Sequence, residues 1–375
     1  MKNCICKKLD LIQQLFTPER LTKSKQRWEC IWKGVLPQDR LPFVYYPRYF
    51  NYYNDFNFPQ ERDKRLELML DECILHGRLN DDFIPALFPG CRHSTIPSMF
   101  NVDEKSIGQE ITCERIIQTV EDIHNLPEPH IISSSVASEW LETQRYWLEQ
   151  TSSRIPIHVT DMQGPFDVCA QMMGYDQLFI AALSEPEVIN RFFKIVSDAF
   201  ILFWQEQKEL LGDLFIPTHL FGWSWMPSQL GATLSADSMV MVSPDFFEEF
   251  YLPILNRISA KLGGLTVHSC GNFGHILSRL QMVQNLRGIN AGQMSLQQLQ
   301  QSGLRNNIVV IIIVQEGEPL AAVIDHIKAF SQPVDLTLHL YPEELLSKPV
   351  EVWSDSDWTL LYRREEALLK LLATN

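Results

Sequence analysis

The sequence carries a His-x-Cys pair at the end of an apolar segment. His268 and Cys270 follow residues 264–267, and Gly271 comes directly after them. On a β-strand, side chains two residues apart share a face, so the imidazole and the thiol project together. Both groups are ligands that zinc accepts. The pair therefore predicts a site for a soft divalent metal; the alternative is a buried histidine and a buried cysteine that only pack.

Other polar side chains follow further apolar segments of the chain. If those segments are parallel strands of one barrel, their carboxyl ends meet at one rim, where barrel enzymes carry their chemistry. The alternative is that loops are polar in any protein. The residues at these positions are Tyr46, Arg48, Asp161, Gln163, Trp223, Gln293, Gln315, Glu316, His339 and Tyr341.

The elements that must position these side chains are eight apolar, β-branched segments separated by amphipathic stretches. Eight strands, each followed by a helix, predict an α/β fold, the (β/α)8 TIM barrel. An open doubly wound sheet is the second choice, because no Gly-x-Gly-x-x-Gly turn follows an early strand. The predicted strands are residues 43–46, 82–87, 155–160, 215–221, 264–268, 288–291, 308–314 and 334–340.

Helical periodicity is clear in three longer stretches. Residues 186–211 repeat apolar side chains at helical spacing, residues 244–262 follow Ser243 as a helix N-cap, and residues 357–372 form a closing helix. No repeat or low-complexity linker divides the chain. We expect an N-terminal helical extension over residues 1–40 and a single barrel domain over residues 41–375.

Composition and charge limit the partners. The 375 residues are 45% hydrophobic and carry a formal net charge of −14. This balance predicts a soluble protein without general affinity for nucleic acid or anionic membranes. The chain has no apolar run of about 20 residues. Its eight cysteines, with no secretory signal ahead of them, indicate reduced thiols in the cytoplasm. The oligomeric state stays open, a homodimer being one option.

Three motifs resemble the uroporphyrinogen decarboxylase superfamily, which also contains zinc-dependent cobamide methyltransferases. Residues 242–253 (VSPDFFEEFYLP) lead to His268-Ser269-Cys270-Gly271 and are similar to a helix start and strand end of that family. Residues 161–166 (DMQGPF) resemble its Gly-Pro loop, and residues 26–42 its approach to the first strand. The resemblance implies a (β/α)8 barrel enzyme that acts on a small molecule.

The family contains two activities, decarboxylation and methyl transfer, which require different residues. Heme-pathway decarboxylases of the family have an Arg-Gln-Ala-Gly-Arg motif after the first strand, whereas this chain has Tyr45-Tyr46-Pro47-Arg48 there. The methyltransferase members hold zinc with His-x-Cys and a later cysteine, and accept a methyl group from a corrinoid carried by a partner protein. No cysteine follows Cys270, so the resemblance leaves His339, or else Glu316, as the third ligand.

Roles for the remaining residues follow from this assignment. We expect Asp161, Gln163 and Tyr341 to be catalytic, and Asp237 to support a metal ligand from the second shell. Cys91 and His93 form a reversed Cys-x-His pair that is either functional or coincidental. The residues expected to bind substrate are Arg48, Trp223, Gln293 and Glu316.

Two other functions remain open at this stage. One is decarboxylation of a tetrapyrrole or another acid without a cofactor, with an acid-base pair such as Asp161 and Tyr341. The other is a non-catalytic sensor or binding barrel, which the missing third cysteine favours.

Overall fold

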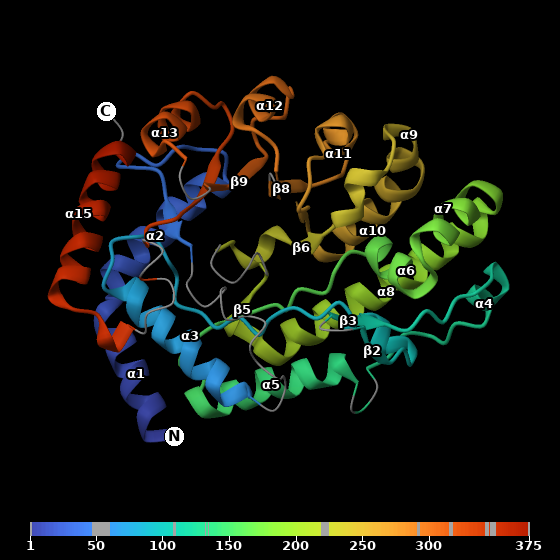
Figure 1. Ribbon diagram of the computed structural model, residues 1–375, viewed down its shortest axis with the longest axis horizontal. Coiled ribbons are helices and arrows are strands. Elements are labelled where there is room, and N and C mark those ends of the chain that lie inside the picture. Colours follow the sequence, from blue (N-terminus) through green and yellow to red (C-terminus); the bar gives the residue numbers. More distant parts are fainter. Residues whose placement is uncertain are drawn as a thin grey trace.

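Parallel strands surrounded by helices form the body of the protein (Figure 1). The computed structural model describes residues 2–46, 61–107, 110–131, 133, 135–218, 225–290, 293–314, 318–341, 345 and 350–373. Within them, six parallel strands make one sheet in the order β1-β10-β9-β8-β7-β6. They are β1 (Phe43–Tyr45), β6 (Ala232–Ser235), β7 (Leu265–His268), β8 (Leu286–Asn290), β9 (Val309–Val314) and β10 (Val334–Leu338).

The wall continues from this sheet through a second, two-stranded parallel sheet. It pairs β4 (Ile157–His158) with β5 (Phe215–Ile216). Residues 82–87 join the two sheets, because the Asp82 amide donates to the Phe43 carbonyl (2.8 Å) and Leu87 forms a parallel bridge with Ile157. On the other side, the Thr233 hydroxyl of β6 donates to the Pro217 carbonyl just after β5 (3.2 Å). The strands thus close on themselves, and the predicted TIM barrel with an N-terminal helical extension is confirmed.

The strand assignments need two corrections. Residues 82–87 are extended but form only a single bridge, so they are not a regular strand. Strand β6 was not predicted, because Ala232-Thr233-Leu234-Ser235 is short and has one β-branched residue. With β6 counted, six plus two parallel strands give the expected eight. An antiparallel hairpin of β2 (Glu104–Ile107) and β3 (Glu110–Cys113) lies outside this wall.

Helices cover the outside of the barrel. The predicted helix over 186–211 is α8 (Pro186–Leu211). The predicted helix over 244–262 has a π turn at Phe247–Tyr251, where Pro253 has no amide hydrogen to offer residue 249. The helices are α1 (Lys2–Leu15), α2 (Pro18–Trp32), α3 (Arg62–Gly77), α4 (Val120–His124), α5 (Val136–Thr151), α6 (Pro165–Met173), α7 (Tyr175–Ser184), α8, α9 (Pro244–Phe246), α10 (Leu252–Leu262), α11 (Leu277–Leu280), α12 (Leu296–Gln301), α13 (Leu320–Lys328) and α15 (Asp355–Leu372).

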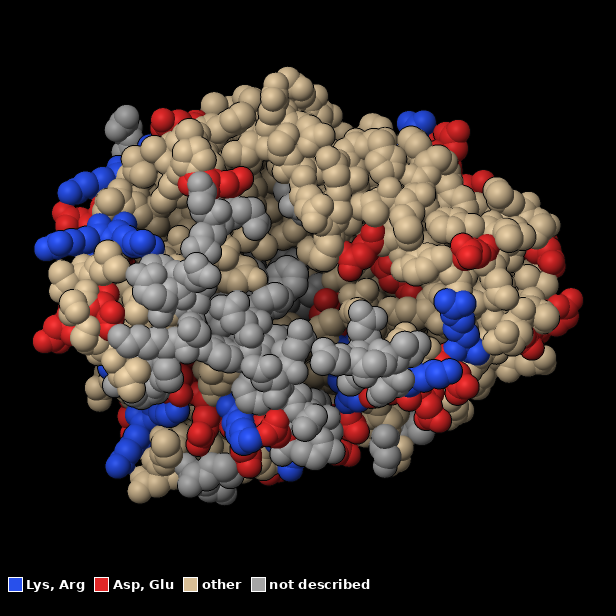
Figure 2. All heavy atoms as spheres, in the orientation of Figure 1, with Lys and Arg blue, Asp and Glu red and all other residues tan. Residues whose placement is uncertain are grey.

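Helices α1 and α2 form the expected extension; the division at residue 40 stays a prediction. No helix in the described ranges has both the length and the apolar character that a bilayer span requires. On the face drawn in Figure 2, acidic and basic side chains are interspersed. The lysines and arginines drawn in blue form no continuous basic patch among the described residues of this face.

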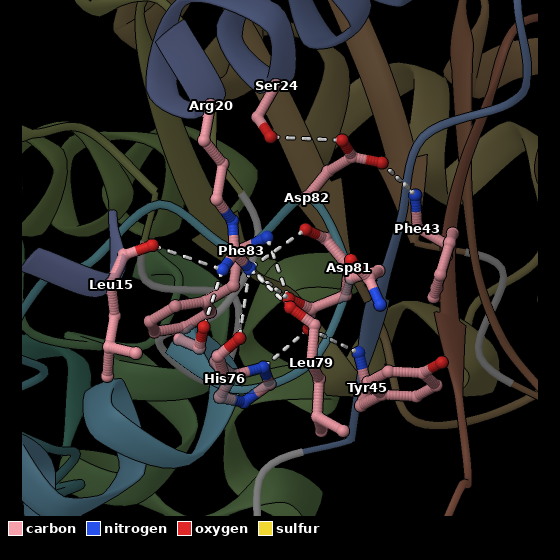
Figure 3. Close-up of polar contacts among 12 residues, drawn as sticks. Leu15, Arg20, Ser24, Phe43, Tyr45, His76, Leu79, Asp81, Asp82 and Phe83 are labelled. Atoms are coloured by element: carbon pink, nitrogen blue, oxygen red, sulfur yellow. Dashed lines mark hydrogen bonds and ion pairs between the residues drawn. The ribbon is translucent and has the colours of Figure 1, made fainter. Parts of the chain in front are cut away.

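A buried carboxylate attaches α2 to the amino-terminal side of the barrel. Asp82 accepts hydrogen bonds from the Ser24 hydroxyl (3.0 Å) and the Phe43 amide (3.2 Å) (Figure 3). It accepts another from Arg27 (2.7 Å). It also pairs with Arg40. Two guanidinium groups and two neutral donors therefore satisfy a fully buried charge, which is the condition under which such a charge is tolerated.

A second buried group lies beside it, at the end of α3. Arg20 donates to the carbonyls of Gly77 (2.7 Å) and Leu79 (2.7 Å), so it occupies acceptors that the end of this helix leaves open. His76 contacts Asp81 (Nδ1 to Oδ2, 2.5 Å) and stacks on Phe83 (Figure 3). Burial alone would lower the pKa of His76, but Asp81 and then Glu72 outweigh it and raise this pKa to about 9.

Unfolding should therefore become easier as the pH rises. The His76 pKa is higher in the folded than in the unfolded chain. Its stabilisation is complete below about pH 6.5 and is lost as the pH rises through about 9. We expect the wild type to lose up to about 3 kcal/mol more unfolding free energy than His76→Gln across this range. Urea titrations at pH 6.5, 8 and 9.5 measure the difference; parallel curves would contradict it.

Candidate metal centre at the mouth of the barrel

The parallel register of β6 and β7 brings the central residues of the site together. Ser235, the last residue of β6, lies opposite His268, the last residue of β7. The His268 side chain is buried, whereas Cys270 is exposed at the mouth. His268 Nε2 lies 3.3 Å from Cys270 Sγ. The imidazole and the thiol are thus adjacent, as the spacing predicts, and their role as metal ligands stays a prediction.

A third donor comes from the segment after β6. Asp237 Oδ1 accepts a hydrogen bond from the Cys270 amide (2.8 Å) and lies 3.8 Å from His268 Nε2. Ligand atoms of Asp237, His268 and Cys270 all lie within 4.8 Å of one another. Asp237, expected to support a ligand, thus lies as close to the imidazole and the thiol as a third ligand would.

His339 lies elsewhere on the rim. It follows β10, which β8 and β9 separate from β7 in the sheet, and its ring stacks on Tyr46 with centroids 4.4 Å apart. Among the described residues it is not part of the group of three donors. Asp237 is therefore the described donor that lies beside the pair, and a ligand role for His339 stays a prediction.

The donor set fits zinc, and the electrostatics of the thiol support the fit. Although Cys270 is exposed as a residue, partial burial, followed by the nearby Asp237 and Asp161 carboxylates, raises the pKa of its thiol to about 12. The thiol is therefore protonated at neutral pH when no cation is near. The same negative charges would attract a divalent cation, which favours the thiolate. One sulfur, one nitrogen and one carboxylate oxygen are each ligands of zinc, and three protein ligands leave a fourth position open for a substrate.

Asp161 and Gln163 lie in a tight loop after β4. Asp161 Oδ2 accepts a hydrogen bond from the Ser235 hydroxyl (3.1 Å), and Oδ1 accepts one from the Gln163 amide (3.1 Å). Gln163 has a left-handed backbone (φ 59°), a conformation that costs free energy in residues other than glycine. Because Ser235 pairs with His268, this loop is connected directly to the strand that carries His268.

Behind the centre lies a carboxyl group that the sequence analysis missed. Asp167, in the first turn of α6, is 2% exposed and accepts hydrogen bonds from the amide (2.8 Å) and the hydroxyl of Ser238. Burial raises the pKa of Asp167 to about 7, although the Ser238 donors oppose the shift. The signal in the sequence was a single acid within the apolar segment Pro165–Met173.

The other predicted residues do not gather at the three donors. Tyr341 is buried and packs near Trp353, with ring centroids 6.2 Å apart. Gln293 is exposed between β8 and α12. Arg48, Trp223 and Glu316, predicted to bind substrate, lie outside the described residues.

The reversed Cys-x-His pair is divided between two environments. Cys91 forms a parallel backbone bridge with Asp161 and therefore lies at the mouth. His93 is exposed. The structure thus places the cysteine of this pair, and not the histidine, next to the loop that carries Asp161.

Comparison with known proteins supports the family suggested by the motifs. The model of the uroporphyrinogen decarboxylase (URO-D) family matches residues 101–222. The predicted resemblance to the uroporphyrinogen decarboxylase superfamily is confirmed over these residues. The URO-D match contains the loop of Asp161 and the buried Asp167, whereas His268 and Cys270 lie beyond it. No curated protein matches the chain.

The fold is similar to that of a solved methyltransferase. The structure of a methyltransferase from Methanosarcina mazei superposes with a TM-score of 0.60 and 15% sequence identity. The match covers 92% of this chain and 98% of the methyltransferase. At this identity the likeness shows the fold of the chain and leaves its activity to other evidence.

Gly164 allows the loop of Asp161 to approach β6. A Cβ atom at this position would lie 2.4 Å from the Ser235 carbonyl oxygen, a backbone atom that cannot rotate away. We expect Gly164→Ala to cost about 1–3 kcal/mol of unfolding free energy. The matched control is Gly274→Ala, whose Cβ would meet a movable side-chain oxygen of Asn272 at 3.2 Å. Chemical denaturation compares the two; equal losses would show that the close approach does not matter.

Proposed function

We propose that the protein is a zinc-dependent methyltransferase that transfers a methyl group from a corrinoid, carried by a partner protein, to a thiol. The observation that carries the proposal is the meeting of Asp237, His268 and Cys270 at the carboxyl ends of β6 and β7. Barrel enzymes bind substrates at this end. The family match and the methyltransferase fold are consistent with it.

The protein groups have complementary tasks in this reaction. His268 offers a neutral nitrogen, while the Cys270 thiolate and Asp237 contribute two negative charges that balance a divalent ion. When bound, zinc would lower the pKa of a thiol substrate, so that the more nucleophilic thiolate is present at neutral pH.

The loop after β4 would handle the substrate. Asp161, oriented by the Ser235 hydroxyl, is placed to accept the proton that the thiol releases. Gln163, whose amide donates to Asp161 in the same loop, would hydrogen-bond the remainder of the molecule. Asp161 and Gln163 follow β4, and Ser235, which orients Asp161, is the last residue of β6, the neighbour of the strand that carries His268.

Decarboxylation is the second candidate, because the matching family model is named for it. Asp161 is the described residue best placed to act as its acid or base. A substrate with many carboxylates needs several cations at the mouth. After the first strand this chain offers one arginine, Arg48, where heme-pathway decarboxylases carry two.

Metal content tests the ligand set. We expect near-stoichiometric zinc in wild-type protein prepared without a metal-binding tag, and none in His268→Ala/Cys270→Ala, because two of three donors are gone. Asp237→Ala should bind zinc more weakly, while His339→Ala, the matched control, retains it. Elemental analysis and competition with a chromophoric chelator measure both. Zinc-free wild type, or zinc retained by the double variant, would sink the proposal; loss in His339→Ala alone would restore His339 as the third ligand.

A direct assay separates the two candidate reactions. Zinc-loaded protein should demethylate methylcobalamin in the presence of a small thiol, seen as a change in the visible spectrum. Cys270→Ala should lose at least about 100-fold in rate, because a ligand is missing. Cys30→Ala, a thiol on α2, should keep the wild-type rate. Release of CO2 from a tetrapyrrole acid with no demethylation would favour the decarboxylase instead.

A further inference from the structure

Asp167 lies directly behind the turn that carries one of the three donors. It belongs to the first turn of α6, and the Asp237–Met241 3-10 turn lies against it. Asp167 Oδ1 accepts a hydrogen bond from the Ser238 amide at 2.8 Å and a second from the Ser238 hydroxyl. A carboxylate that accepts amide hydrogens at the start of a turn acts as a cap, here supplied by another helix.

From Ser238 the contact continues to the candidate ligands. Ser238 follows Asp237 in the chain, and Asp237 Oδ1 accepts from the Cys270 amide (2.8 Å) and faces His268 Nε2 (3.8 Å). Asp167 therefore holds the backbone from which Asp237 reaches the other two donors. Tyr175 supports the same point, since its hydroxyl lies 3.0 Å from that of Ser238.

A rigid wall holds Asp167 itself. Phe166, the preceding residue, stacks on Tyr251 with centroids 4.5 Å apart and lies 5.2 Å from Phe193. Tyr251 belongs to the π turn Phe247–Tyr251, so the helix over residues 244–262 packs against the start of α6. Around such apolar side chains a carboxyl group is costly to bury, and an aliphatic residue would fill the space at less cost. What a carboxyl group provides at this position, and an aliphatic residue would not, is the pair of hydrogen bonds to Ser238 of the turn.

We propose that Asp167 is a positioning residue: by capping the Asp237–Met241 turn it keeps Asp237 directed at His268 and Cys270. The role of this positioning in function rests on the proposed function, in which Asp237, His268 and Cys270 bind zinc. Outer partners that orient ligands commonly contribute 10- to 100-fold in metal affinity. The geometry assigns this role to a carboxyl group on α6, outside the strands that provide the ligands.

Two measurements on Asp167→Ala test the inference. Zinc affinity, from chelator competition, should fall about 10- to 100-fold. In metal-free protein, hydrogen exchange should accelerate at the amides of the turn and at Cys270, since the cap and the Asp237 contact loosen. Asp167→Asn should lie between the variant and the wild type, because its amide oxygen still accepts the Ser238 N–H.

Val168→Ala is the matched control, since Val168 is the next residue of α6 and is fully buried. It should lower stability without changing zinc affinity or exchange at the turn. Equal effects of Val168→Ala and Asp167→Ala would reduce Asp167 to ordinary packing, and unchanged exchange in Asp167→Ala would overturn the inference. If Asp167→Ala does not fold, Ser238→Ala removes the hydroxyl hydrogen bond of the same contact and keeps the amide one, so exchange at the turn should accelerate to a smaller extent. A wild-type protein that binds no zinc would contradict only the proposed function. Hydrogen exchange in the metal-free protein would still show whether Asp167 fixes the turn.

Discussion

The parallel register of β6 against β7 is the constraint on which the site depends. It places Ser235 opposite His268, so the segments that leave the two strands run side by side. Asp237 and Cys270 are each two residues further along, and the Cys270 amide meets the Asp237 carboxylate at 2.8 Å. A slip of one residue would turn each side chain to the other face of its strand and separate the donors.

The loop after β4 depends on the same strand end. Asp161 reaches Ser235, and Gly164 permits an approach that no larger residue could make. A second contact of this kind occurs at Gly271, where a Cβ atom would lie 2.5 Å from the Val240 side chain. Two glycines thus bring three loops together, and two of these loops place a carboxylate, Asp161 or Asp237, near the thiol of the third. The result is a negative mouth that keeps the Cys270 thiol protonated and is suited to a divalent cation.

The opposite end of the barrel has buried charges of another kind. Asp82 is surrounded by Arg27 and Arg40, and His76 lies between Asp81 and Glu72, so the charges on that side are compensated within the protein. Such networks attach the N-terminal helices to the barrel. This division, with stability on the amino-terminal side and chemistry at the carboxyl ends of the strands, is general for TIM barrels.

The sequence by itself determined the features that depend on neighbouring residues. Alternation along a strand placed His268 beside Cys270, helical periodicity located α8, and Ser243 marked a helix start that its hydrogen bond to the Phe246 amide (3.2 Å) bears out. Seven of the eight predicted strands coincide with strands of the barrel wall, since buried parallel strands are continuous apolar runs.

Only the tertiary structure decided which distant residues meet. Asp237 and Cys270 are 33 residues apart, and Asp167 and Ser238 are 71 apart, so no local pattern connects them. Strand β6 could not be predicted, because four residues of mixed polarity show no clear alternation of apolar and polar side chains. Without β6, the position of Asp237 could not be inferred. Among the described residues, the third donor beside His268 and Cys270 is Asp237, because the pairing of strands around a closed barrel, and not spacing along the chain, determines which side chains meet at its mouth.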